Sequence, residues 1–118
     1  MQYMIVIVEN ETEWGNAGPA DRERTTAAYG KYTQDLQKAG IMLGGEALLP
    51  SSKGARVKVR DGKRAVKDGP FSEAKEVIGG FYIIQVKSKE EAIEWASRCP
   101  AAQSGEVEVR EVMEMAKK

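Results

Sequence analysis

The sequence predicts a single α+β domain with the β-α-β-β-α-β order of a ferredoxin-like fold. Two short apolar runs, residues 3–8 and 77–86, have the composition of strands buried on both faces. Two amphipathic segments, each bounded by helix signals, lie between the predicted strands. The length of 118 residues is typical of one domain, so residues 1–118 are interpreted as one unit.

The first half of the chain predicts strand, helix, strand and an inserted hairpin. After the strand at 3–8, Gly18-Pro19 predicts a helix start, and Gly40 predicts its end. One apolar stripe of this helix is formed by Tyr29, Tyr32, Leu36 and Ala39. Residues 41–49 predict the second strand, in which Gly44-Gly45 indicates a bulge or a close approach of backbones. Residues 56–60 and 63–67, joined by Asp61-Gly62, predict a hairpin inserted into the core plan.

The second half predicts strand, helix and strand. The third core strand covers residues 77–86. Ser88 and Glu91 form a capping box that opens a helix, and Pro100 predicts its end. Residues 106–110 alternate between polar and apolar side chains and predict the last strand.

Charge and composition exclude several classes of function. Eighteen basic and 18 acidic residues cancel, which disfavours general binding to nucleic acid. The apolar run at the N-terminus is too short for an export signal or a membrane span, and the only cysteine, Cys99, suits a reducing compartment, so we expect a cytoplasmic protein. The sequence has no zinc-type cluster, Walker loop or dinucleotide fingerprint, so we predict no metal and no cofactor.

The apolar strands also predict a homodimer that forms through the sheet. In a ferredoxin-like domain both helices cover one face of the sheet. Side chains alternate along a strand, so about five large apolar side chains remain on the other face, whichever set the helices cover. Leaving them in water would forgo on the order of 10 kcal/mol. We therefore expect a second copy of the chain to pack on this face.

Residues 68–82, DGPFSEAKEVIGGFY, resemble the signature of the DGPF-domain branch of the YCII-related family. The likeness extends to Gly44-Gly45-Glu46, residues 59–62, Glu94-Trp95-Ala96 and residues 107–110. The resemblance implies a dimeric α+β barrel, related in fold to muconolactone isomerases. The family is largely uncharacterised, and it is suspected of catalysis because its members pair a histidine with the aspartate of the motif.

This chain contains no histidine, and Tyr29 stands where the first helix of similar proteins often carries one. If the site is catalytic, Asp68 would act with Tyr29 as its partner. Asp68 has two interpretations: a general base in a cleft, or an acceptor of backbone N–H groups that fixes the turn. Tyr29 likewise has a packing role or a role in donating a hydrogen bond to a ligand.

Other candidates keep two interpretations each. Glu46, in an apolar strand, must face a cleft, a partner or the sheet edge. Tyr82, beside Gly79-Gly80, is either core or ligand-binding, and Gly80 is assigned with it to the substrate site. Glu73 and Glu76 are interpreted as solvated charges, or as two carboxylates on one face that serve proton transfer or hold a hard cation. Cys99 is interpreted as a buried small residue. Seven cations of the hairpin either protect a strand edge or bind an anionic partner; they are Lys53, Arg56, Lys58, Arg60, Lys63, Arg64 and Lys67.

Together these features predict a pocket between sheet and helices that binds or transforms a small polar metabolite. The expected chemistry is cofactor-free proton transfer of the isomerase or lyase type, with Asp68 moving the proton and Tyr29 holding an oxyanion. The alternative is a non-catalytic module that binds a ligand or a regulatory protein. A cavity that reaches Asp68 would favour chemistry over binding alone.

Overall fold

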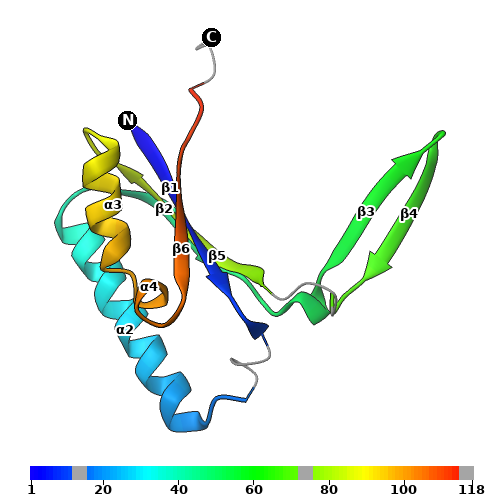
Figure 1. The fold of residues 1–118 in the computed structure, drawn as a ribbon, viewed down its shortest axis with the longest axis horizontal. Coiled ribbons are helices and arrows are strands. Elements are labelled where there is room, and N and C mark those ends of the chain that lie inside the picture. Colours follow the sequence, from blue (N-terminus) through cyan, green and yellow to red (C-terminus); the bar gives the residue numbers. More distant parts are fainter. Residues whose placement is uncertain (12–15, 72–75, 115–118) are drawn as a thin grey trace.

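The computed structural model describes residues 1–11, 16–71 and 76–114 and has the predicted ferredoxin-like α+β architecture (Figure 1). Four strands, β1 (Gln2–Glu9), β2 (Met42–Ala47), β5 (Val77–Gln85) and β6 (Glu106–Glu111), form an antiparallel sheet in the order β2-β5-β1-β6. Helices α2 (Pro19–Lys38), α3 (Lys89–Ser97) and α4 (Pro100–Ser104) lie on one side of it.

Most predicted boundaries are confirmed, and their physical causes are visible. Helix α2 begins with Pro19 at its first position, and Gly40 adopts a positive φ of 72° just after its end. At the start of α3 the Glu91 backbone N–H donates to Ser88 Oγ at 3.1 Å, as expected for a capping box. The prediction for Pro100 is only partly correct. Helix α3 ends before it, but Pro100 then opens the short helix α4, where its missing N–H costs nothing.

The core lies between the helices and one face of the sheet. Strand register places Tyr3, Ile5 and Ile7 of β1 on this face, with Tyr82 and Ile84 of β5. These side chains are buried against Tyr32 and Leu36 of α2 and against three small residues of the second helical segment, Ala92, Ala96 and Cys99. The core therefore uses alternate residues of each apolar strand.

The opposite face of the sheet has no helix over it within the described ranges. Register places Met4 and Val6 of β1 there, beside Phe81 and Ile83 of β5. Carboxylates flank this apolar centre: Glu46 lies opposite Phe81, and Glu106 and Glu108 lie on β6. This pattern matches the face on which the sequence predicts a second copy, and we call it the uncovered face.

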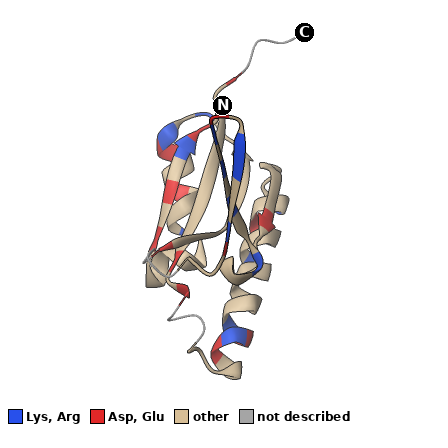
Figure 2. Ribbon diagram, turned by 90° about the vertical axis from the view of Figure 1, so that its right-hand side faces the viewer, with Lys and Arg blue, Asp and Glu red and all other residues tan. Residues whose placement is uncertain are grey.

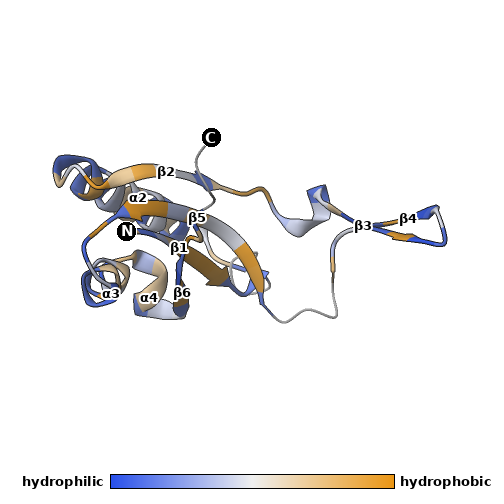
Figure 3. Ribbon diagram, turned by 90° about the horizontal axis from the view of Figure 1, so that it is seen from above, coloured by the Kyte–Doolittle hydropathy of each residue, from blue (hydrophilic) through white to orange (hydrophobic). Residues whose placement is uncertain are grey.

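Strands β3 (Ala55–Arg60) and β4 (Lys63–Asp68) form a separate two-stranded sheet, which we call the arm. Asp61 and Gly62 make the predicted tight turn, with φ of 53° and 75°. Every residue of both strands is exposed. The arm projects away from the helices (Figures 1 and 3), and a short 3₁₀ turn at Ser51–Lys53 precedes it.

No helix among the described residues is long and apolar enough to cross a membrane.

Candidate functional site

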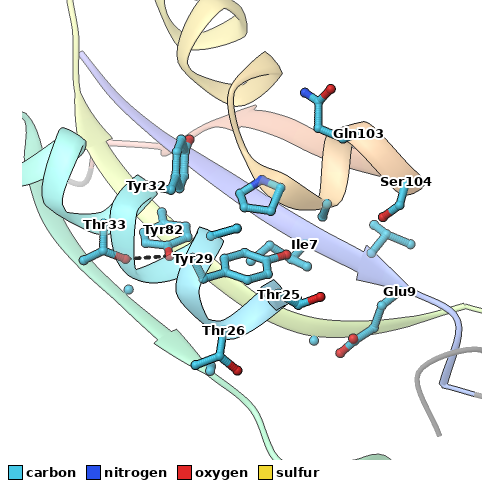
Figure 4. Close-up of a pocket in the computed structure, with 18 of the residues that line it drawn as sticks. Ile7, Glu9, Thr25, Thr26, Tyr29, Tyr32, Thr33, Tyr82, Gln103 and Ser104 are labelled. Atoms are coloured by element: carbon cyan, nitrogen blue, oxygen red, sulfur yellow. Dashed lines mark hydrogen bonds between the residues drawn. The ribbon is translucent and has the colours of Figure 1, made fainter. Parts of the chain in front are cut away.

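A broad open hollow of about 1580 Å³ lies between α2, the sheet and α4. The strand ends of β1 and β2 and the short helix α4 border it, and α2 supplies its longest wall. Its lining includes residues with polar side-chain groups, namely Glu9, Thr25, Tyr29, Thr33 and Tyr82 (Figure 4). The volume exceeds that of typical ligand pockets, so the hollow has room for a small molecule and water.

Tyr29 lies in this hollow, as the sequence predicts. It stands on the face of α2 that points to the sheet, and its side chain is half-buried. Burial, followed by the neighbouring Cys99 and Glu9, raises the pKa of the Tyr29 phenol far above its ordinary value. The phenol therefore stays protonated at neutral pH and is suited to donate a hydrogen bond.

Glu9 also lines the hollow, although it is not among the candidate site residues predicted from the sequence. It ends β1 on the face that carries Ile5 and Ile7, so its carboxylate points into the hollow near Tyr29 (Figure 4). Burial and then the nearby Glu11 carboxylate raise its pKa. Among the described residues none donates a hydrogen bond or pairs as an ion with this carboxylate. A half-buried carboxylate without a partner is suited to bind a ligand or a proton.

Gly79 makes room for Glu9. A Cβ atom at Gly79 would overlap the Glu9 carboxylate, so glycine at this position leaves space for that side chain beside β5. The sequence held two signals for this arrangement. Position 9 continues the alternation of residues 3, 5 and 7, and a charge there ends an otherwise apolar stripe.

Tyr82 forms part of the wall, but its polar group is already satisfied. Its hydroxyl and Thr33 Oγ1 lie 2.9 Å apart in a hydrogen bond, and its ring meets that of Tyr32 edge to face with centroids 5.2 Å apart. Tyr32 in turn donates to the Trp95 carbonyl at 2.8 Å. Tyr82 thus joins α2 to the sheet while one side of its ring borders the hollow.

Glu46 and Gly80 occupy other positions than the predicted substrate site requires. Glu46 borders the hollow, but its pairing with Phe81 directs its side chain to the uncovered face, so its main chain is the part that borders the hollow. Gly80 is buried within the sheet, where a Cβ would lie 2.7 Å from the Glu46 carbonyl oxygen. Gly80 therefore permits β5 to approach β2 closely.

Asp68 lies outside the hollow. It is the exposed last residue of β4 and pairs with Ala55, and it is absent from the residues that border the space around Tyr29. The predicted Asp68–Tyr29 pair is therefore not assembled within a single chain. The cavity that would have favoured chemistry at Asp68 does not reach it.

The rest of the DGPF motif shapes the base of the arm. Gly69 lies so close to the Ser51 carbonyl that a Cβ would overlap it, and the Gly69 N–H donates to the Gly54 carbonyl at 3.0 Å. The Phe71 ring is buried, with the Arg56 guanidinium 4.1 Å from its centroid. Glu73, the first of the predicted carboxylate pair, lies outside the described residues, whereas Glu76 is exposed at the rim of the hollow.

Glu11 completes the base of the arm. Its carboxylate accepts hydrogen bonds of 2.6 Å from both the backbone N–H and the hydroxyl of Ser51. These two hydrogen bonds lower the pKa of Glu11. The end of β1 is thereby connected to the segment from which the arm departs.

Comparison with known proteins assigns the chain to a family. The sequence profile of the YCII-related domain matches residues 1–116. This chain belongs to the YCII-related family. The YCII-related chain is 29% identical over 112 residues to an uncharacterised protein of Rhizobium meliloti (strain 1021), an alignment that covers 93% of this chain and 90% of that protein.

The fold is similar to that of a solved enzyme structure. It is the 5-chloro-2-hydroxyhydroquinone dehydrochlorinase TftG from Burkholderia phenoliruptrix AC1100, in complex with 2,5-dihydroxybenzoquinone. The TM-score is 0.55, the sequence identity is 18%, and the match covers 96% of the YCII-related chain and 94% of the other. A likeness at this identity supports the fold and leaves the reaction open.

Within the part of the YCII-related chain that the structure describes, no three His, Cys, Asp or Glu residues cluster in a way that could hold a metal ion. Cys99 is fully buried in the core, and burial raises the pKa of its thiol, so it has the character of a packing residue.

Proposed function

We propose that this YCII-related protein binds a small oxo- or hydroxy-substituted molecule in the hollow and transfers a proton on it. One observation carries the proposal: a half-buried carboxylate without a partner among the described residues, Glu9, lies beside the protonated phenol of Tyr29 in an open hollow. The Glu9 carboxylate can accept a proton, and the Tyr29 phenol can donate a hydrogen bond, so the two groups have complementary roles in proton transfer.

Each group has a distinct task in this proposal. Glu9 has a raised pKa, so it exchanges protons closer to neutral pH than an ordinary carboxyl group does. Tyr29 donates a hydrogen bond to an oxygen on which negative charge develops when the proton leaves carbon. Both tasks are performed by the chain's own side chains, so the reaction needs no cofactor.

The chemistry of the lining favours a flat, polar, uncharged or weakly acidic molecule. Tyr29 and Tyr82 provide aromatic surface, whereas Thr25, Gln103 and Ser104 provide hydrogen-bonding groups (Figure 4). TftG, which shares the fold, has been solved with 2,5-dihydroxybenzoquinone bound. This compound is therefore a reasonable first probe for the YCII-related chain, followed by small hydroxy and oxo acids.

Calorimetric titration with these probes tests the proposal. We expect Glu9→Gln and Tyr29→Phe each to weaken binding of an active probe by about tenfold or more, which corresponds to about 1.4 kcal/mol. Asp68→Asn is the matched control, because it removes a carboxylate that lies outside the hollow. If Asp68→Asn abolished binding while Glu9→Gln did not, the site would belong to Asp68, as the motif suggested.

Binding without catalysis is the second candidate function, and the absence of histidine from the chain favours it. A binding module would hold the probe unchanged. Proton exchange at an acidic C–H of the bound probe, followed by NMR in deuterium oxide, separates the two functions. Exchange that depends on Glu9 supports catalysis, whereas tight binding without exchange supports the module.

We further propose that the protein works in the cytoplasm as a homodimer joined through the uncovered face. Val6, Phe81 and Ile83 provide an apolar centre there, and Glu46 and Glu108 form a polar rim. Phe81→Lys should dissociate such a dimer without changing the core, because Phe81 points away from the helices. Sedimentation of the wild type and of Phe81→Lys tests this proposal. A wild-type monomer at micromolar concentration would contradict the dimer.

A further inference from the structure

We propose that the arm is a clasp for a second copy of this chain: its apolar face packs on the flank of the copy seated on the uncovered face. This inference rests on the proposed dimer and goes beyond it by assigning a function to β3 and β4. Three observations support it: the two faces of the arm differ, the arm stands on the open side of the sheet, and its charge is opposite to that of the rest of the chain.

The pairing of β3 with β4 gives the arm one apolar and one cationic face. Val57 pairs with Val66, and Val59 pairs with Arg64, so three valines share a face. Their exposed fractions are 60% for Val57, 57% for Val59 and 52% for Val66. The other face carries Arg56, Lys58, Arg60, Lys63 and Lys67 around Ala65. Edge protection by lysines explains the cationic face, but it does not explain exposed valines.

An isolated two-stranded hairpin is marginally stable in water, so an arm of this kind needs a surface that covers its apolar face. Its own domain does not provide one. The arm projects from the ends of β2 and β5 on the side of the sheet opposite the helices, which is the side of the uncovered face (Figures 1 and 3). A second copy packed on the uncovered face would lie on the same side of the sheet as the arm.

Charge complementarity favours the second copy over other occupants. Residues 53–68 hold seven of the 18 cationic and two of the 18 acidic residues, which leaves 11 cations and 16 carboxylates in the rest of the chain. Figure 2 shows the distribution of these charges over the ribbon. The arm of one copy is thus attracted to the acidic remainder of another. The arm has no aromatic residue on which a nucleic-acid base could stack, which disfavours that alternative.

Cysteine labelling tests the clasp directly. Val66→Cys and Ala65→Cys place thiols at neighbouring positions on opposite faces of β4, and the native Cys99 is fully buried. We expect the thiol at position 66 to react with a maleimide at least tenfold more slowly in the dimer than in the Phe81→Lys monomer. The thiol at position 65 should react at similar rates in both. If the thiol at position 66 reacted as fast in the dimer as in the monomer, the clasp would be wrong, although the sheet dimer could still form.

A second measurement uses variants that keep the charge of the arm. Val57→Gln with Val66→Gln should raise the dimer dissociation constant at least tenfold, since it removes apolar contacts between copies. Lys58→Arg with Ala65→Gln alters the adjacent pair on the opposite face, also without changing the charge, and should change the dissociation constant less than threefold. Circular dichroism checks that all variants fold. An unchanged dissociation constant in the valine variant would contradict the clasp, and a wild-type monomer would refute both the clasp and the dimer on which it rests.

Discussion

Glu9 and Glu11, two carboxylates near the end of β1, lie in contrasting environments. The contrast distinguishes a residue of the candidate site from a residue that stabilises the fold. Glu9 points into the hollow with a raised pKa and no hydrogen-bond or ion-pair partner among the described residues. Glu11 holds Ser51 at the base of the arm through two hydrogen bonds, and its pKa is lowered. A carboxylate that stabilises structure is satisfied, whereas one that is available for a ligand or a proton is not.

Two glycines near these carboxylates differ in the same way: Gly69 packs against Ser51, which Glu11 holds, and Gly79 packs against Glu9. Of the substitutions considered, Gly69→Ala should have the largest effect on stability. Gly69 faces a backbone carbonyl, that of Ser51, which cannot move aside. We expect Gly69→Ala to destabilise the protein by about 2 kcal/mol, as in other overpacked sites. Thermal unfolding, with hydrogen exchange of the arm, measures this.

Gly54→Ala is the matched control for that substitution. A Cβ at Gly54 would lie 3.4 Å from the same Ser51 oxygen, which is close to ordinary contact. It should shift the midpoint of unfolding far less than Gly69→Ala does. Equal effects of the two substitutions would contradict the claim that the DGPF motif is needed for close packing at the arm base.

Unlike Gly69→Ala, Gly79→Ala should have a large effect on ligand binding and a small effect on stability. The added methyl group would displace the end of a flexible side chain, Glu9, rather than backbone. We expect binding of an active probe to weaken about tenfold, while the free energy of unfolding changes by less than about 1 kcal/mol. Calorimetric titration and thermal unfolding of one preparation measure both. Unchanged binding would show that the position of Glu9 does not matter.

Tyr82→Phe should have an intermediate effect on stability. It removes the hydrogen bond to Thr33 and keeps the ring contact with Tyr32, so a loss of about 1 kcal/mol is expected. Denaturant unfolding measures it. Thr33→Val with Tyr82→Phe should cost little more than the single change, because one hydrogen bond connects both groups.

The smallest effects should appear in the pH dependence of stability, with opposite signs for the two carboxylates. The pKa of Glu9 is raised above 4.5 on folding, so the folded state favours its proton, and that advantage is lost as pH rises through the folded pKa. Glu9→Gln should therefore stabilise the protein at neutral pH, with the gap closing at acid pH.

Glu11 should behave in the opposite way. Its pKa is lowered, so its contribution is present above the unfolded pKa and lost as pH falls through the folded one. Glu11→Gln should destabilise the protein at neutral pH and converge with the wild type in acid. Melting curves from pH 3 to 8 measure both variants. If the two variants shifted the melting temperature in the same direction at neutral pH, the opposite contributions assigned to Glu9 and Glu11 would be contradicted.

Much of the fold could be predicted from the sequence because local signals and tertiary structure agree. The turn at Asp61-Gly62, the glycine after α2 and the capping box at Ser88 each act within a few residues. The alternation of β1 and β5 also separates the core from the uncovered face. Helix α4 was missed because proline ends one helix and starts another equally well.

The candidate site was less predictable because it depends on long-range geometry. The apolar stripe of its helix predicts that Tyr29 faces the sheet, and the family resemblance makes it a candidate site residue. The place of the Glu46 side chain depends on the register of β2 against β5, which directs it to the other face. The place of Asp68 depends on how the arm leaves the domain, at a base where Gly69 lies close to the Ser51 carbonyl. The alternation of β1 alone places Glu9 on the core face, whereas the DGPF motif belongs to the base of the arm.

NMR mapping of a bound probe determines whether the ligand site is the hollow around Glu9 and Tyr29. The amide spectrum of the YCII-related chain would be recorded during titration with 2,5-dihydroxybenzoquinone. We expect saturable shifts at Glu9, Tyr29 and Gly79, which lie around one end of the hollow. We expect none at Asp68 or along the arm. Shifts centred on residues 55–69, with the hollow unaffected, would show that the ligand site is at the arm and not in the hollow.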